Sequence, residues 1–213
     1  MTDSQGIFIT LEGPEGAGKS TQIDRLSTAL TAQGRDVLCT REPGGTALGE
    51  ELRRLIKHFG KPGEVCPEAE LLMFGASRAQ LMREVIVPHL RTGGVVISDR
   101  FADSTTVYQG IARKLDPDFI ERMHALTLSG RWPDLTLLLD LEPSAGLSRT
   151  RGRRGQAAPD RIEAESGEFH EAVRAGFLKL AEAHPERIKI IRADAPPDEV
   201  HEHIMEVVGR VLG

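Results

Sequence analysis

The chain has 213 residues, of which 39% are hydrophobic and 28% charged, and its net charge is −5 at pH 7. This length and composition are typical of a globular protein with one domain. The acidic balance argues against a basic field over the whole molecule that would attract nucleic acid or an anionic membrane.

No window approaches 18 apolar residues, and the first residues lack a basic segment followed by an apolar core. We therefore expect neither a membrane span nor a signal peptide. Cys39 and Cys66 are the only cysteines. Two isolated cysteines make no disulfide framework and no zinc pattern, which favours a reducing compartment, the cytoplasm.

Short apolar runs alternate with longer segments of helical periodicity. Strands are predicted at 7–12, 36–41, 94–99, 135–141 and 187–192. Helices are predicted at 18–33, 47–58, 67–91, 103–113, 116–129, 143–151, 165–184 and 197–212. Apolar strands bounded by helices indicate an α/β fold of three layers, a five-stranded parallel sheet with helices on both faces. No internal repeat or second domain is evident, so 1–213 is expected to form one domain.

A phosphate-binding loop follows the first predicted strand. Residues 13–20 read Gly-Pro-Glu-Gly-Ala-Gly-Lys-Ser, which matches G-x-x-x-x-G-K-[ST] between a strand and a helix. The glycines let backbone N–H groups turn around an anion, Lys19 can reach the β- and γ-phosphates, and Ser20 can ligate Mg²⁺. The motif predicts a P-loop NTPase-type fold that binds a nucleoside triphosphate. The residues expected at the nucleotide are Gly13, Pro14, Glu15, Gly16, Ala17, Gly18, Lys19, Ser20 and Thr21.

Asp99 and Arg100 stand at the end of the third predicted strand. Parallel sheets bind ligands beyond the carboxyl ends of their strands. A carboxylate there can hold Mg²⁺ directly or through water, and a guanidinium beside it can fork onto a phosphate. The alternative is an ion pair between the two residues.

An arginine-rich segment at 149–160 predicts a mobile lid over the nucleotide. Four arginines, Arg149, Arg151, Arg153 and Arg154, precede small residues and a proline. Arginines can stabilise a phosphoryl group in transfer, and a lid excludes water. A solvated basic loop and a nucleic-acid patch are the alternatives, although the acidic balance and the lack of interleaved aromatic residues disfavour the second.

Three further features are candidates for a second ligand. Phe74 and Arg78 share one helix face, so the ring can stack on a base while the guanidinium bonds the edge of that base. The alternative is that Phe74 belongs to the core and Arg78 is solvated, as is more common for helical residues of these types. The segment 104–110 offers hydroxyls and an amide, or it is an ordinary helix start. Pro43 lies in a Gly-rich loop that either contacts ligand or is a plain turn.

Together these segments resemble the bacterial type of thymidylate kinase. The matching pieces are collinear and lie at 11–21, 40–46, 72–81, 99–105, 108–110, 131–136 and 160–163. The resemblance implies a nucleoside monophosphate kinase that phosphorylates dTMP to dTDP with ATP and Mg²⁺ in dTTP synthesis. It also implies a homodimer that forms through a helical face, and no nucleic-acid or membrane partner.

The resemblance also implies individual roles. Arg100 grips the dTMP phosphate, Phe74 stacks on thymine, and Arg78 bonds its exocyclic oxygen. The dTMP contacts implied are Pro43, Phe74, Arg78, Arg100, Thr105, Tyr108 and Gln109. The catalytic candidates are Glu15, Lys19, Arg100 and Arg153, the metal candidates are Ser20 and Asp99, and Arg149 is expected to stack on adenine.

Residues 156–159 make the lid longer than the family pattern, which leaves open whether Arg151, Arg153 or Arg154 reaches the phosphates. Other functions also stay open at this point. A GTPase is excluded because its guanine-reading motif needs asparagine, which the chain lacks. A kinase for a nucleoside or for another monophosphate is the nearest alternative, and a nucleoside kinase would need Glu42 or Asp99 as a base for the 5′-hydroxyl. A DNA-binding ATPase is the next alternative.

Overall fold

The computed structural model describes residues 6–60, 64–154 and 159–212, without the side chains of residues 153 and 154. In this part of the chain, five parallel strands form one sheet in the spatial order β2-β3-β1-β4-β5. The strands are β1 Ile7–Glu12, β2 Val37–Arg41, β3 Val95–Asp99, β4 Leu135–Asp140 and β5 Ile188–Arg192. The predicted five-stranded parallel sheet is confirmed, and each predicted strand end lies within one residue of the observed end.

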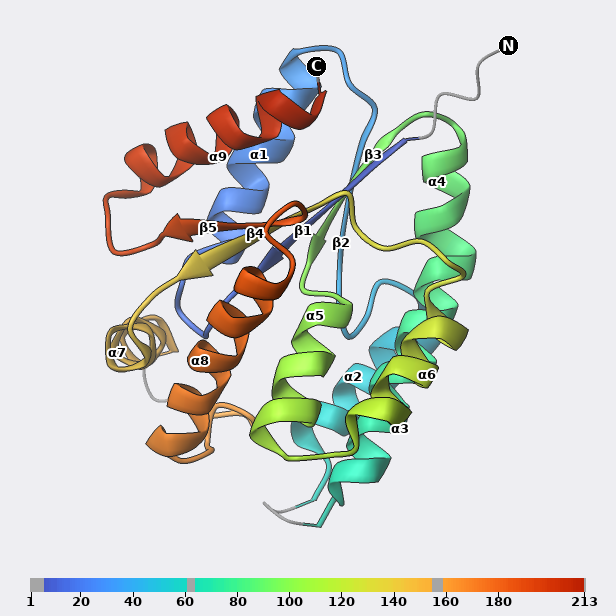
Figure 1. Cartoon of the computed structure of the whole chain (residues 1–213), viewed down its shortest axis with the longest axis vertical. Coiled ribbons are helices and arrows are strands. Elements are labelled where there is room, and N and C mark those ends of the chain that lie inside the picture. The colour runs from blue at the N-terminus through green and yellow to red at the C-terminus, as the bar shows by residue number, and fades with distance from the viewer. Residues whose placement is uncertain (1–5, 61–63, 155–158, 213) are drawn as a thin grey trace.

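Helices cover both faces of the sheet (Figure 1). The helix α1, Lys19–Ala32, and the helix α9, Pro197–Leu212, lie side by side on one face. The other helices are α2 Ala47–His58, α3 Pro67–Leu81, α4 Val87–Arg91, α5 Ala102–Thr105, α6 Pro117–Thr127, α7 Pro143–Arg154 and α8 Gly167–Ala183. No helix in the described ranges is long and apolar enough to cross a membrane.

The side chains of the central strands alternate between two cores, as the two-residue period of a strand requires. Ile9, Ile97 and Leu137 pack with α1 and α9, whereas Phe8 and Val96 pack with α3 and α4. All five are fully buried. Burying one such side chain contributes about 1.5–3 kcal/mol, so the two cores hold the strand ends, and the loops that follow them, in a fixed arrangement.

Two predicted helices contain wider π-helical turns. The helix predicted at 67–91 divides into α3, the segment η1 at Met82–Ile86, and α4. The helix predicted at 103–113 begins as α5 and continues as η2 at Thr106–Ala112. Apolar spacing does not separate a π turn from an α turn over so few residues. Because π turns are frequent at functional sites, it matters that η2 carries Tyr108 and Gln109.

The arginine-rich segment begins as helix, not as loop. The helix α7 continues to Arg154, three residues beyond the predicted end, because arginine is a good helix former and no proline occurs before Pro159. Arg149 and Arg151 are therefore helical. Residues 155–158 of the predicted lid lie outside the described residues, and the lid itself stays a prediction.

Candidate active site

The loop after β1 is built to hold an anion. Gly13, Gly16 and Gly18 have φ values of 134°, 74° and 91°, which residues with a Cβ rarely adopt. A Cβ on Gly16 would meet the carbonyl oxygen of Gly146 at 2.1 Å, so the close approach of α7 requires glycine there. No acidic residue stands in the first turn of α1. The free N–H groups and the positive end of that helix dipole are thus available to a phosphate.

Lys19 points back into this loop. Its Nζ donates to the carbonyl oxygens of Gly13 at 3.1 Å and Pro14 at 2.9 Å, and the residue is 7% exposed. Burial, together with the nearby guanidinium of Arg100, lowers the pKa of Lys19 to about 8. A phosphate beside Lys19 would favour the protonated amine and raise this pKa again.

Ser20 and Asp99 bring two oxygens together beside the loop. β1 and β3 are neighbours in the sheet, with Leu11 in register with Asp99, so the end of β3 lies next to the start of α1. The Oγ of Ser20 donates to Oδ2 of Asp99 at 3.1 Å. A hydroxyl and a carboxylate are oxygen ligands that suit Mg²⁺, which takes its other ligands from water and phosphate.

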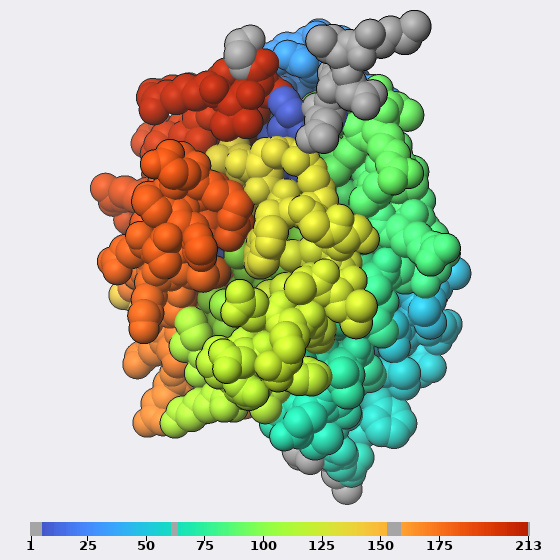
Figure 2. Space-filling model, turned by 45° about the vertical axis from the view of Figure 1, so that its right-hand side comes forward, coloured from blue at the N-terminus to red at the C-terminus, as the bar shows by residue number. Residues whose placement is uncertain are grey.

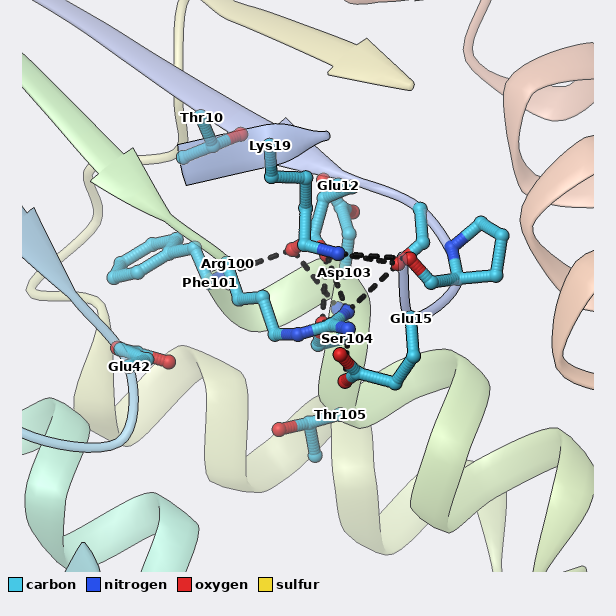
Figure 3. A network of polar contacts seen from close by, with 12 residues as sticks. Thr10, Glu12, Glu15, Lys19, Glu42, Arg100, Phe101, Asp103, Ser104 and Thr105 are labelled. Atoms are coloured by element: carbon cyan, nitrogen blue, oxygen red, sulfur yellow. Dashed lines mark hydrogen bonds and ion pairs between the residues drawn. The ribbon is translucent and has the colours of Figure 1, made fainter. Parts of the chain in front are cut away.

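Arg100 lies at the centre of a polar network (Figure 3). Its φ is 69°, and its guanidinium donates to the carbonyl oxygen of Gly13 at 3.0 Å and to Oε1 of Glu15 at 2.7 Å. Burial alone would raise the pKa of Glu15, but Arg100 and Lys19 together lower it to about 2. Glu15 is therefore a charged partner of Arg100, and an anion at this guanidinium would have to compete with it.

A second carboxylate, Glu12, fixes the turn that carries Arg100. It is fully buried at the end of β1 and accepts hydrogen bonds from the N–H of Phe101 at 2.8 Å and the hydroxyl of Ser104 at 2.6 Å. Burial raises the pKa of Glu12 to about 7, against the opposing effect of Arg100. These bonds tie the end of β1 to the start of α5, and they fix the backbone that follows Arg100 in the turn.

Away from the phosphate loop, Glu42 and Arg78 form a buried ion pair. Nε and Nη2 of Arg78 donate to Oε2 of Glu42 at 2.9 and 2.7 Å, and Nη2 also donates to Oγ1 of Thr105 at 2.8 Å. Nη1 of Arg78 is buried and has no partner among the described residues. Leaving such a donor unpaired costs about 1–3 kcal/mol, which a ligand oxygen would recover.

One cavity of about 240 Å³ brings most of the predicted residues together. Those that line it are Glu15, Gly16, Gly18, Lys19, Ser20, Thr21, Pro43, Phe74, Asp99, Arg100, Tyr108 and Gln109. Arg78 and Thr105 are buried beside Glu42, which itself lines the cavity. The hydroxyl of Tyr108 is buried without a partner among the described residues, so it too is available to a polar ligand.

Sequence reasoning assigned no site role to three cations that line the cavity, Arg41 at the end of β2 and Arg53 and Lys57 on α2. Arg53 donates to the carbonyl oxygen of Pro43 at 2.9 Å, and Lys57 pairs with Asp160 at 2.7 Å. Their i, i+4 spacing on the helix after the Gly-rich loop was a usable signal. Glu12 was missed too, although a charge at the end of an otherwise apolar strand was equally visible.

A second cavity, of about 430 Å³, lies between the phosphate loop and the start of α9. Arg149 lines it and donates to the carbonyl oxygen of Ala193 at 3.0 Å. Gly18 and Thr21 line it as well, so it adjoins the loop expected to hold the triphosphate. The side chain of Arg153 is outside the described residues, and its predicted role stays a prediction.

The comparisons with known proteins agree on one family. A family model described as thymidylate kinase matches residues 11–204. A thymidylate kinase of Deinococcus radiodurans is 48% identical over 205 residues, which are 96% of this chain and 97% of that protein. A thymidylate kinase of Desulfovibrio desulfuricans is 49% identical over 198 residues, 91% of each chain.

Solved structures give the same result. The crystal structure of thymidylate kinase from Ehrlichia chaffeensis has a TM-score of 0.76 and 31% sequence identity, and the match covers 95% of this chain and 98% of that one. Family model, relatives and fold thus agree over nearly the whole length. The chain belongs to the thymidylate kinase family and is a nucleoside monophosphate kinase.

Proposed function

We propose that this enzyme transfers the γ-phosphoryl group of ATP to dTMP, which yields ADP and dTDP for dTTP synthesis. The observation that carries the proposal is one cavity lined by Lys19, Arg100 and Phe74. Lys19 suits a triphosphate, Arg100 suits a monophosphate, and Phe74 suits a planar base. A site for one nucleotide alone would not need a second phosphate-binding cation beside an aromatic ring.

The reaction needs cations that hold the two phosphate groups in place, and it needs no general base. A phosphate monoester has a second pKa of about 6, so the acceptor is largely dianionic at pH 7. One of its oxygens attacks the γ-phosphorus while the bond to the β,γ-bridging oxygen breaks. Arg100 exchanges its bond to Glu15 for the acceptor phosphate, and Lys19 holds the donor. The work of the site is to align two anions against their repulsion.

Ser20 and Asp99 fit a magnesium site, since their side-chain oxygens lie 3.1 Å apart beside the phosphate loop. When bound, the ion neutralises charge on the β- and γ-phosphates. Arg149 would lie on adenine in the second cavity, and Arg153 would reach the transferred group. We propose that residues 1–213 form one kinase domain in the cytoplasm, with a lid at about 149–160.

The base of dTMP is proposed to lie between Phe74 and Pro43, which line the same cavity. The unpaired Nη1 of Arg78 would donate to an exocyclic oxygen of thymine. Gln109 lies at the far edge of the base. Tyr108 crowds the ribose 2′ position, which favours deoxyribose.

An acceptor panel tests the proposal. The purified protein, ATP and Mg²⁺ are mixed with dTMP, dUMP, UMP, dGMP or AMP, and ADP release is followed. We expect dTMP to give the highest kcat/KM and UMP to give much less than dUMP. Preference for AMP or dGMP would contradict the thymidylate assignment, and ADP release independent of any monophosphate would indicate an ATPase.

We also propose a homodimer that forms through α3 and α6, which lie side by side (Figure 2). These helices carry large apolar side chains that are exposed in the single chain, Leu72 at 55%, Phe119 at 41% and Leu126 at 82%. Leu126→Glu is expected to give a monomer in analytical ultracentrifugation. Val211→Glu, on α9, is the matched control and should stay dimeric. A wild-type protein that sediments as a monomer would refute the dimer.

A further inference from the structure

Glu70, on α3, is a buried carboxylate behind the acceptor pocket, and it has more partners than its charge requires. The residue has no exposed surface. It accepts hydrogen bonds from Nε of Arg113 at 2.7 Å, from Nη2 of Arg161 at 2.5 Å and from the side-chain amide Nε2 of Gln109 at 2.8 Å. Two guanidinium groups already compensate the carboxylate. The bond to Gln109 is therefore not needed to compensate the charge of Glu70. Its consequence is to orient the side-chain amide of Gln109.

Gln109 lines the same cavity as Phe74 and is 1% exposed. An amide can present either its donor nitrogen or its acceptor oxygen, and the two orientations have nearly the same shape. A carboxylate paired with guanidinium groups only accepts hydrogen bonds. The amide nitrogen of Gln109 must therefore face Glu70, because the reverse orientation would bring two acceptor oxygens into contact.

The orientation leaves the amide oxygen of Gln109 for the ligand. This oxygen has no hydrogen-bond partner among the residues that the structure describes. The amide nitrogen keeps a second N–H, but its direction is fixed by the bond to Glu70. The pocket wall at this point thus presents an acceptor whose position is set by a residue outside the cavity lining.

We propose that Glu70 is a positioning residue that holds the acceptor oxygen of Gln109 toward the base and so sets which pyrimidines the enzyme takes. The inference rests on the proposed function, which places a base beside Phe74. A 4-keto pyrimidine, thymine or uracil, carries an N3–H donor that satisfies this oxygen. In cytosine N3 is itself an acceptor, so two acceptors would face each other and binding is opposed.

Glu70→Gln tests the inference through ratios of specificity constants. The amide introduced can donate to Gln109 as well as accept from it, so both orientations of Gln109 become accessible. We expect the ratio of kcat/KM for dTMP to that for dCMP to fall about tenfold or more. The ratio for dTMP to dUMP should stay within about twofold, because both bases carry N3–H. Where dCMP is too poor an acceptor, its inhibition constant against dTMP replaces kcat/KM.

A merely structural role makes a different prediction. Damage to the fold lowers activity with every acceptor alike and leaves both ratios unchanged, and that outcome would overturn the inference. Gln109→Ala supplies a second check, since Glu70→Gln should not alter the dTMP to dCMP ratio further in that background. A further change of the same size would show that Glu70 does not act through Gln109.

Glu165→Gln is the matched control. Glu165 accepts from Arg113 at 2.9 Å, so this variant removes one carboxylate from the same guanidinium without touching Gln109. Both ratios should be those of the wild type, and an equal fall in the dTMP to dCMP ratio would assign the effect to charge and overturn the inference. If Glu70→Gln does not fold, Glu70→Asp keeps the charge and draws the carboxylate back by roughly 1.5 Å, with the same expected ratios. Wild-type protein inactive on dTMP would refute the proposed function instead.

Discussion

Glu42→Gln is expected to destabilise the fold by about 3–5 kcal/mol, the cost of breaking a buried ion pair from one side. The Glu42 and Arg78 side chains are 3% and 1% exposed, and two nitrogens of Arg78 donate to the carboxylate. The substitution keeps the shape of the side chain and removes its charge. The guanidinium is then buried without compensation, because Thr105, its remaining partner, is neutral.

Two further variants isolate this cause. Glu42→Gln with Arg78→Met removes both charges, and replacing a buried pair by uncharged groups is often neutral. The double variant should therefore recover most of the lost stability. Glu51→Gln is the exposed control, since Glu51 and Arg54 are 69% and 66% exposed in their pair. Its loss should stay below about 1 kcal/mol.

Urea unfolding at one temperature, pH 7 and one protein concentration gives the four free energies of unfolding. A loss below about 1 kcal/mol for Glu42→Gln would refute the argument, and so would a double variant no more stable than the single one. In the kinetic assay, the KM for dTMP should rise in both Glu42 variants because Arg78 is displaced or absent. The KM for ATP should change little.

Three other predictions concern the phosphate groups. Arg100→Ala should lower kcat/KM for dTMP by about 10³ or more while calorimetry shows the Kd for ATP within a few-fold of wild type; equal losses would contradict its place on the acceptor. Gly16→Ala should abolish ATP binding. The control Gly209→Ala, where an added Cβ meets nothing within 4 Å, should keep ATP binding and stabilise the fold by up to about 1 kcal/mol. Thermal unfolding with and without ATP measures both effects. ATP affinity should weaken as the pH rises through about 8, because phosphate binds protonated Lys19 and the free protein loses that proton there; a Kd that is constant on both sides of pH 8 would refute this.

Much of the fold could be predicted because its signals are local. The strands are short apolar runs that end at a charged residue, as β1 does at Glu12 and β3 at Asp99. The parallel order then places every strand end at one edge of the sheet. That rule predicts that the phosphate loop and Arg100 lie together, and the lining of one cavity by both agrees with it.

The partnerships within the site could not be predicted, because they join residues far apart in the chain. Arg100 pairs with Glu15, 85 positions away, and Arg78 with Glu42, 36 positions away. Helical spacing correctly placed Phe74 and Arg78 on one helix, but it could not show that Arg78 is fully buried. Only the carboxylate supplied by the loop after β2 makes that burial tolerable.

The pairing of cations with carboxylates also bears on how the site can bind two anions. Arg100 pairs with Glu15, Lys57 with Asp160 and Arg41 with Glu50, so three cations of the cavity already have an anionic partner. In the proposed function, a phosphate that binds Arg100 would therefore replace a carboxylate and would not simply add to a positive pocket. The exchange gives up part of the binding free energy, but it keeps each cation oriented beforehand, and catalysis depends on orientation in the transition state more than on tight binding of the ground state. For a reaction that must align two phosphate groups, a cation that is paired beforehand, as Arg100 is, is thus a better solution than a free one.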